Sequence, residues 1–482
     1  MASRAGVRDL TTGPIGWTLL AFALPTLGSS ILQSLNGSVN AIWVGRFLGE
    51  DALAATSNAH IIMFLLASFV FGFGMAATIL IGQAFGRRDV DEARRVMGTA
   101  TGAFFVIALL IGLAGWLLAP AILSALGTPS GAEEHALAYL RVIFIAMPPL
   151  LLMSMFSMAL RGSGDAMTPL WFMILAVILD AGLNPVFILG LGPAPEMGIA
   201  GSAAATVIAN WVSVVAMLVT IYVRDLPLRL KGPELAYLKP DWGLLRNIVA
   251  KGLPMGMQMI VISASGVALF GLVNREGVET TAAFGVAMQL WGYLQMPAMA
   301  LGAAVSAMAA QNIGAGRWDR VGTVTRVGIL FHFLLTGVLV AVLFAVDHAA
   351  LTLFLGPDSA AVPIAQHIHL LATWSFLLFG VTLVIFGTVR ANGAVIAPLV
   401  ILTIGLVVVR FGWIAATYDW LGADALWLSF PASSLANMLL ALAYYARGGW
   451  RKARMTPPPT PDECIEESEA TMEPGGRLNP TG

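Results

Sequence analysis

The stretch VGILFHFLLTGVLVAVLFAV, residues 327–346, contains no aspartate, glutamate, lysine or arginine. A helix needs roughly 20 such residues to cross the hydrocarbon core of a bilayer. Eleven further stretches are similarly long and mostly apolar, and they predict transmembrane helices rather than the short alternating strands of a barrel. In chain order the twelve predicted spans are 15–40, 53–83, 97–122, 137–159, 169–191, 198–223, 252–273, 281–311, 327–346, 368–388, 396–417 and 425–446.

The composition agrees with a polytopic membrane protein. Of the 482 residues, 58% are hydrophobic and 11% are charged, against about 25% charged in a typical soluble domain. The net charge of −1 provides no basic field for nucleic acid. The single cysteine, Cys464, excludes a disulfide or a multi-cysteine metal site within one chain.

The basic residues predict the orientation. With the N-terminus inside, 21 of the 26 lysines and arginines fall in cytoplasmic segments, whereas the outer loops hold only Arg46 and Arg275. This asymmetry follows the positive-inside rule and places both termini in the cytoplasm. We therefore expect a multi-pass integral protein of the plasma membrane.

The two halves of the chain resemble each other at an offset near 229 residues. LRGSGDAMTPL from Leu160 corresponds to VRANGAVIAPL from Val389, and Leu24-Pro25 recurs as Leu253-Pro254. Gln83 and Gln311 also correspond, and we expect them to be structural elements at the cytoplasmic end. Six spans per copy preserve the topology, so the copies are parallel repeats, which suggests alternating access around a central site.

The repeat defines five predicted regions. They are a cytoplasmic N-terminal arm (1–14), an N-lobe of six spans (15–223), a cytoplasmic linker (224–251), a C-lobe of six spans (252–446) and a basic, then disordered, cytoplasmic tail (447–482). The fold class is all-α, with twelve transmembrane helices in two pseudo-symmetric lobes.

Asp180 is the one acidic residue placed deep inside a predicted span. A carboxylate in hydrocarbon is costly, and such residues usually face a cavity. Because burial favours the neutral form, a carboxyl group there could bind and release a proton and could also pair with a cationic substrate. The alternative is a structural carboxylate that hydrogen-bonds neighbouring helices.

Other polar residues follow helical spacing and could share a cavity with Asp180. Asn184 lies four residues later on the same helical face, next to Pro185, which weakens the backbone ladder. Two further stripes are equally consistent with ligand binding and with interhelical hydrogen bonding. They are Gln33, Asn36 and Asn40 in the first span and Thr206 and Asn210 in the sixth.

The predicted spans of the C-lobe contain no aspartate or glutamate. Trp291 and Met288 could line a drug cleft or could pack against lipid and neighbouring helices. Arg410 falls near the repeat equivalent of Asp180, and it could pair with Asp180 or be structural. His367 and His369 do not share a helical face, so no metal site is expected.

Four segments together resemble the multidrug and toxic compound extrusion (MATE) family. They are LPTLGSSILQSLNGSVNAIWVGRFLGEDALAA from Leu24, GQAFGRRD from Gly82, LRGSGDAMTP from Leu160 and the segment 179–206, and the likeness extends to about residue 446. The resemblance implies a V-shaped pair of lobes in the bacterial inner membrane. It also implies efflux of organic cations or amphiphilic compounds, driven by a proton or sodium gradient.

The chain departs from the family's N-lobe-carboxylate pattern at two points. Family members commonly show Asn-x-x-x-Asp-Pro in the fifth span, whereas this chain has the reversed order Asp180-x-x-x-Asn184-Pro185. They also commonly carry an acidic residue where this chain has Asn40, an amide that cannot exchange a proton. We therefore expect Asp180 to carry the coupling alone, supported by Asn40, Asn184 and Thr206.

The predicted function is secondary efflux by proton antiport, with sodium as the second candidate ion and no other cofactor. Gln33, Asn36, Asn210, Trp291 and Met288 join Asp180 as candidate substrate ligands. A flippase for lipid-linked saccharides is the alternative, but only Arg141 and Arg410 could hold phosphate. A membrane enzyme or receptor is a further alternative, although no ATP-binding loop or hydrolase motif occurs. The partners are small organic substrates and the bilayer, and the protein is expected to be a monomer.

Overall fold

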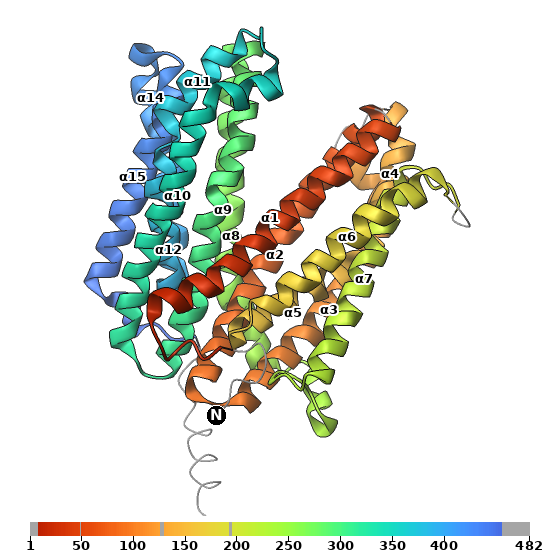
Figure 1. Ribbon diagram of the computed structural model, residues 1–482, viewed down its shortest axis with the longest axis vertical. Coiled ribbons are helices and arrows are strands. Elements are labelled where there is room, and N and C mark those ends of the chain that lie inside the picture. Colours follow the sequence, from red (N-terminus) through yellow and green to blue (C-terminus); the bar gives the residue numbers. More distant parts are fainter. Residues whose placement is uncertain (1–7, 49, 126–129, 192–194, 456–482) are drawn as a thin grey trace, which may run out of the picture.

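The computed structural model describes residues 8–48, 50–125, 130–191 and 195–455. Cys464, the predicted disordered tail 456–482 and the first seven residues of the predicted arm lie outside the described residues. In the described part of the chain every regular element is a helix. Figure 1 shows two groups of helices, α1–α7 and α8–α15, which meet at one end of the molecule and diverge toward the other.

The first group follows the predicted N-lobe. Its helices are α1 (Ile15–Leu48), α2 (Glu50–Arg87), α3 (Val90–Ala125), α4 (Ser130–Ile145), α5 (Met147–Ser163), α6 (Met167–Leu189) and α7 (Ile199–Val223). A linker with the short helix η1 (Gly232–Leu238) leads to the second group.

The second group begins ten residues before the predicted C-lobe, because α8 starts inside the predicted linker 224–251. Its helices are α8 (Trp242–Val273), η2 (Asn274–Glu276), α9 (Val278–Gly314), α10 (Trp318–Leu355), α11 (Ala361–Ala372), α12 (Ser375–Ala391), α13 (Ile396–Thr403), the π-helix η3 (Ile404–Val409), α14 (Arg410–Leu421), α15 (Asp424–Arg447) and η4 (Gly449–Lys452).

The described helices confirm the twelve predicted spans. Ten are long and apolar enough to cross a membrane, and two bent pairs, α4–α5 and α11–α12, complete the set. Each pair bends by 47°, and the two bends occupy corresponding positions of the two halves. At α5 the cause is local, because prolines stand in its first turn, where a missing backbone donor is tolerated.

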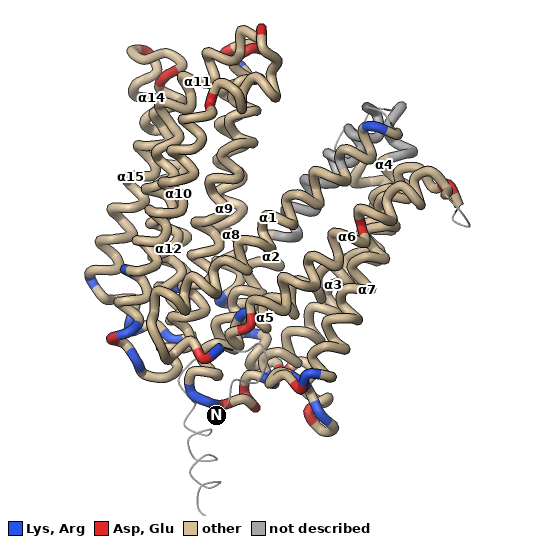
Figure 2. The backbone as a smooth tube through the Cα atoms, viewed as in Figure 1, with Lys and Arg blue, Asp and Glu red and all other residues tan. Residues whose placement is uncertain are grey.

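Lysines and arginines gather at the end where the two groups meet (Figure 2). Few lie at the opposite, diverging end (Figure 2). This distribution is the one that the positive-inside rule predicts for a cytoplasmic closed end. The sidedness of the membrane stays a prediction, since only the arrangement of charge along the molecule is seen.

Glycines allow the two groups to approach closely. A side chain on Gly72 of α2 would collide with the backbone of Gly252 and Gly256 on α8. Nearer the closed end, a Cβ on Gly86 would collide with the Gln311 carbonyl oxygen, and one on Gly314 with the Gln83 carbonyl oxygen. Such contacts between small residues are typical of tightly packed transmembrane helices.

Polar groups at the closed end join the two groups of helices. The Gln83 side chain of α2 donates to the Ala391 carbonyl at the end of α12, at 2.7 Å. The Gln311 amide of α9 donates to the Gly162 carbonyl at 3.0 Å and accepts from the Leu10 backbone N–H at 3.1 Å. The corresponding glutamines of the two repeats thus each bind the opposite half, and the N-terminal segment is part of this closure.

Helix α1 contacts both halves. Its first part carries Leu19 and Phe22, which are buried with Leu301 and Val305 of α9. Its later part runs with the first group and packs against α6 (Figure 1). A change in the contacts of α1 with one group of helices can therefore alter its packing against the other group.

We predict that Gly314→Ala destabilises the protein by about 1–3 kcal/mol, because the added methyl group has no space beside the Gln83 carbonyl. The matched control is Gly285→Ala on the same helix, where nothing lies within 4 Å of the added atom. The control should be neutral or gain up to about 1 kcal/mol, since alanine favours a helix over glycine. Thermal unfolding in detergent measures both, and equal midpoints would contradict the close crossing of α2 and α9.

Candidate functional site

Helix α6 begins at a buried carboxylate. Asp165 accepts hydrogen bonds from the backbone N–H groups of Met167 and Thr168, at 3.0 and 2.9 Å, and from the Thr168 hydroxyl at 2.5 Å. Burial raises the pKa of the Asp165 carboxyl, while the bonds from Thr168 and Met167 oppose that rise. Asp165 falls between the predicted spans 137–159 and 169–191, and the structure shows it buried at the start of α6.

Asp180 lies fourteen residues into α6 and is 1% exposed. Its Oδ2 accepts from the Asn40 amide of α1 at 2.9 Å, and its Oδ1 accepts from the Thr206 hydroxyl of α7 at 3.0 Å. Three helices thus meet at one carboxylate. Among the described residues, no lysine, arginine or histidine forms an ion pair with it.

Asn184 closes this network from the next turn of α6. Its Nδ2 lies 2.9 Å from the Asn40 Oδ1, 2.9 Å from the Asp180 carbonyl oxygen and 3.3 Å from the Asp180 Oδ1. The i, i+4 spacing puts both side chains on one face, as the sequence predicts. Pro185 removes the backbone donor to the Ala181 carbonyl, so the helix is less regular here.

Two amide oxygens beside the carboxylate have no hydrogen-bond donor among the described residues. They are the Oδ1 atoms of Asn184 and Asn36, and both are buried. The Asn36 side chain also lies close to Asp180. Buried polar atoms nearly always have partners, so two unpartnered oxygens close to one carboxylate are unusual. Together with the carboxylate they form an oxygen-rich set suited to water or a hard cation.

The remaining predicted residues of the N-lobe lie apart from the carboxylate. Gln33 is exposed on α1. Asn210 spends its Nδ2 on the Thr206 carbonyl of its own helix, at 2.8 Å. The structure therefore brings Asn36, Asn40, Asn184 and Thr206 to Asp180, and no described hydrogen bond joins Gln33 or Asn210 to it.

In the second group, Trp291 is 2% exposed. Its indole donates to the Thr373 hydroxyl at 2.9 Å, and its ring centroid lies 5.0 Å from that of Phe430 and 5.5 Å from that of Phe376. These contacts favour the packing alternative for Trp291. Met288, on the same helix, is half-exposed, and its role as a substrate ligand stays a prediction.

A buried acid–base pair in the second group is missing from the prediction. Helix α10 extends past the predicted limit of 346 to Leu355, so Asp347 lies within it. The Asp347 Oδ1 lies 2.5 Å from Nδ1 of the buried His369, whose ring is 6.0 Å from Trp291. Asp347 lies one residue beyond the predicted span 327–346, because apolar composition marks the membrane core but not the end of the helix. His367 pairs instead with Asp424, at 2.8 Å.

The intramembrane arginines do not reach Asp180. Arg410 hydrogen-bonds Ser265 and Ser433. Arg141 places its guanidinium 4.9 Å from the centroid of the Trp116 ring. The pairing of Arg410 with Asp180 that the sequence allowed is therefore not formed in this structure.

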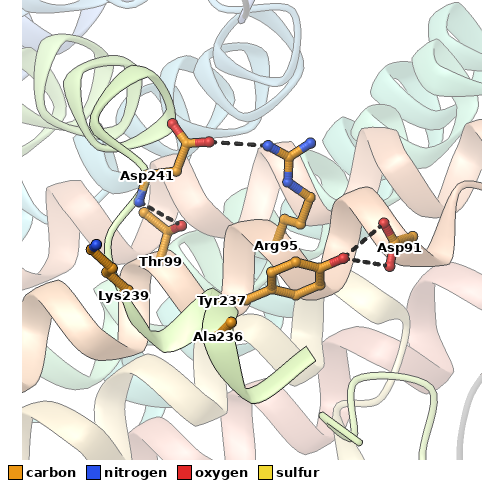
Figure 3. A pocket seen from close by; sticks show the side chains of 7 residues that line it. All are labelled: Asp91, Arg95, Thr99, Ala236, Tyr237, Lys239 and Asp241. Atoms are coloured by element: carbon orange, nitrogen blue, oxygen red, sulfur yellow. Dashed lines mark hydrogen bonds and ion pairs between the residues drawn. The ribbon is translucent and has the colours of Figure 1, made fainter. Parts of the chain in front are cut away.

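A pocket of about 320 Å³ lies between α3 and the linker. Figure 3 shows Arg95 pointing to Asp241 and the Tyr237 hydroxyl pointing to Asp91 across this pocket. The bond to Asp91 raises the pKa of the Tyr237 hydroxyl, since it stabilises the protonated phenol. The charges that line the pocket balance, because Asp91 and Asp241 are negative and Arg95 and Lys239 are positive. The contacts across the pocket thus join the linker to α3, and the pocket is separate from Asp180.

Comparison with known proteins places the chain in one family. The family model MatE matches residues 25–186 and again residues 254–413. The chain is 36% identical over 446 residues to the probable multidrug resistance protein YoeA of Bacillus subtilis (strain 168), covering 92% of this chain and 96% of that protein. It is 30% identical over 451 residues to the probable multidrug resistance protein YpnP of the same strain, covering 93% and 98%.

A solved structure shares the fold. The outward-facing structure of a multidrug resistance MATE family transporter of the MOP superfamily superposes with a TM-score of 0.84 at 19% identity, over 93% of this chain and 99% of that one. The two segments matched by the family model start 229 residues apart, which is the predicted repeat. The chain therefore belongs to the MatE, or multidrug and toxic compound extrusion, family and is a membrane transporter rather than an enzyme.

Proposed function

We infer that this protein exports organic cations or amphiphilic drugs by proton antiport, and that Asp180 couples the two fluxes. The relatives named multidrug resistance proteins support the substrate class. The observation that carries the mechanism is one carboxylate, almost fully buried, held by neutral donors and lacking a fixed cation among the described residues. A proton or a cationic substrate can supply the missing positive charge, so the two compete for one site.

Protonation of Asp180 must rearrange the hydrogen-bond network. The carboxylate oxygens accept from Asn40, Thr206 and Asn184. A proton on Oδ2 would face the Asn40 Nδ2, which is also a donor, and the Asn40 Oδ1 already accepts from Asn184. The bond from α1 to α6 is therefore the one most directly broken by protonation. Because α1 also packs against α9, the change passes to the other lobe.

The direction of transport follows from the proposed topology. The basic closed end lies in the cytoplasm, both termini are cytoplasmic and the diverging end opens to the outside, in the inner membrane of a bacterium. The protein acts as a monomer, since each chain contains both lobes and the site lies within the N-lobe. When the lobes reorient without substrate, burial of a protonated, neutral Asp180 costs less free energy than burial of the charged carboxylate.

Sodium is the second candidate ion. The unpartnered Oδ1 atoms of Asn36 and Asn184, with the Asp180 carboxylate, provide the oxygen ligands that a hard cation prefers. Against sodium stands the small number of charged ligands, a single carboxylate, and we therefore favour the proton. The flippase alternative is less favoured, because Arg141 lies against Trp116 in the N-lobe and Arg410 lies in the C-lobe.

We predict that Asp180→Asn lowers gradient-driven efflux roughly tenfold or more, because the amide keeps the size of the side chain but cannot exchange a proton. Efflux of a fluorescent organic cation from proteoliposomes with an imposed pH gradient measures the effect. The matched control is Asp358→Asn, which makes the same change at an exposed loop position and should transport normally. Unchanged transport by Asp180→Asn would remove Asp180 from the coupling mechanism.

The ion itself is tested on the unaltered protein. In sodium-free potassium buffer, a pH gradient alone should drive full transport, and substrate addition should release protons from detergent-solubilised protein. The Asp180→Asn variant should release no protons when substrate is added. Transport that requires a sodium gradient and ignores the pH gradient would assign the oxygen set around Asp180 to sodium instead.

A further inference from the structure

Arg410 is a buried cation of the second group of helices. It begins α14 and is 7% exposed. Its Nη1 donates to the Ser265 hydroxyl of α8 at 3.2 Å, and its Nε and Nη2 donate to the Ser433 hydroxyl of α15 at 3.3 and 3.1 Å. Its guanidinium carbon lies 4.6 Å from the centroid of the Phe430 ring. Among the described residues, no carboxylate forms an ion pair with it.

The two serines are committed as acceptors. Ser265 donates its own proton to the Leu406 carbonyl at 2.7 Å, and Ser433 donates to the Phe430 carbonyl at 3.0 Å. Their lone pairs therefore point at the guanidinium, which offers five N–H groups and spends three of them on these described contacts. Hydroxyl dipoles and a ring face orient the cation but carry no compensating charge, and an uncompensated buried charge is costly.

The repeat relates this cluster to the Asp180 site. Shifting Asn36 by the offset of 229 gives Ser265, shifting Asp180 gives the position immediately before Arg410, and shifting Thr206 comes within two residues of Ser433. The corresponding three helices of each lobe therefore hold a buried charged group within one residue of the same repeat position. The charge is negative in the N-lobe and positive in the C-lobe.

Two local features distinguish the Arg410 site from ordinary packing. The π-helix η3 ends immediately before Arg410, whereas the corresponding α6 is continuous, and such π-turns occur frequently at functional sites. Asn437 lies one turn beyond Ser433 on the same face of α15, is fully buried and has no partner for either its Oδ1 or its Nδ2 among the described residues. A methyl group on Gly405 of η3 would collide with this amide, so Asn437 faces the π-helix.

We propose that Arg410, Ser265 and Ser433 form a binding subsite for a monovalent anion, and that its ligand in transport is the carboxylate of a zwitterionic amphiphile. The free N–H groups of Arg410 provide charge-assisted donors, and the unpartnered Asn437 amide lies one turn along α15 from Ser433. The proposal rests on the efflux function inferred above and extends its substrate class. Asp180 then receives the cationic part of such a substrate and Arg410 the anionic part. Chloride from solution shares this ligand chemistry, and the experiment separates the two sources.

The test compares two dyes that differ by one charge. Rhodamine B carries a delocalised cation and a carboxylate, and its ethyl ester carries the cation alone. We expect Arg410→Gln to weaken equilibrium binding of rhodamine B to the detergent-solubilised protein by roughly tenfold or more, while binding of the ester changes little. The Arg410→Lys variant should keep part of the preference for rhodamine B over the ethyl ester. The matched control, Arg141→Gln, removes another arginine that lies on an aromatic ring and should affect both dyes equally.

Chloride provides a measurement that needs no variant. At equal ionic strength, chloride should raise the thermal unfolding midpoint of the unaltered protein above its value in gluconate. Competition between chloride and rhodamine B assigns one shared site to both anions. Stabilisation without competition or dye selectivity would overturn the carboxylate assignment in favour of a resident halide. If Arg410→Gln does not fold, Arg410→Lys and this chloride measurement decide.

The proposal is overturned if chloride and gluconate are equivalent and Arg410 variants treat the two dyes alike, because Arg410 would then be a structural side chain. Binding is measured at equilibrium without a gradient, so it does not depend on coupling. The Asp180→Asn variant should lose gradient-driven transport. It should still bind rhodamine B in preference to the ethyl ester, because that preference depends on the carboxylate of the dye. Failure of the coupling mechanism and failure of the anion subsite are thus distinguishable.

Discussion

The hydrocarbon core of a bilayer cannot solvate a charge, and this constraint governs where the protein places its few ionisable groups. Asp180 is tolerated because donors from α1, α6 and α7 surround it within one turn of helix. Each of these donors is neutral, so the site remains short of one positive charge. That deficit is what makes the carboxylate responsive to a proton or a cation, whereas a lysine partner would have satisfied it permanently.

The position of α1 turns this local chemistry into a change between lobes. Its hydrogen bond from Asn40 to Asp180 lies in the first group of helices, while Leu19 and Phe22 lie in the packed core with α9. At the closed end, glycine contacts between α2 and α9 leave no room for side chains to slide past. Movement there requires separation of the two surfaces, including the bonds of Gln83 and Gln311, rather than gradual deformation.

Much of the fold could be predicted from the sequence because bilayer thickness imposes a minimum apolar length on each span. Spacing alone also places Asp180 and Asn184 on one face. The contact with Asn40 was expected from the family pattern, and its partner atoms only emerge once helices from distant parts of the chain meet. Hydropathy could not show that α10 continues past the membrane core, so the Asp347 partner of His369 was missed. It also could not distinguish the packed Trp291 from a ligand-facing one, because both are apolar.

Duplication explains why the two lobes share a polar position without sharing its charge. A buried site formed by three helices persists in each copy because the helix packing that creates it persists, while the residue at its centre is free to change. A buried arginine next to such a position is tolerated only if oriented dipoles or an anion offset its charge. The serines beside Arg410 orient the guanidinium, and no carboxylate in the described part of the chain forms an ion pair with it. A substrate with both charges would bridge lobes that must move relative to each other, so its binding and the alternation of the lobes would be linked.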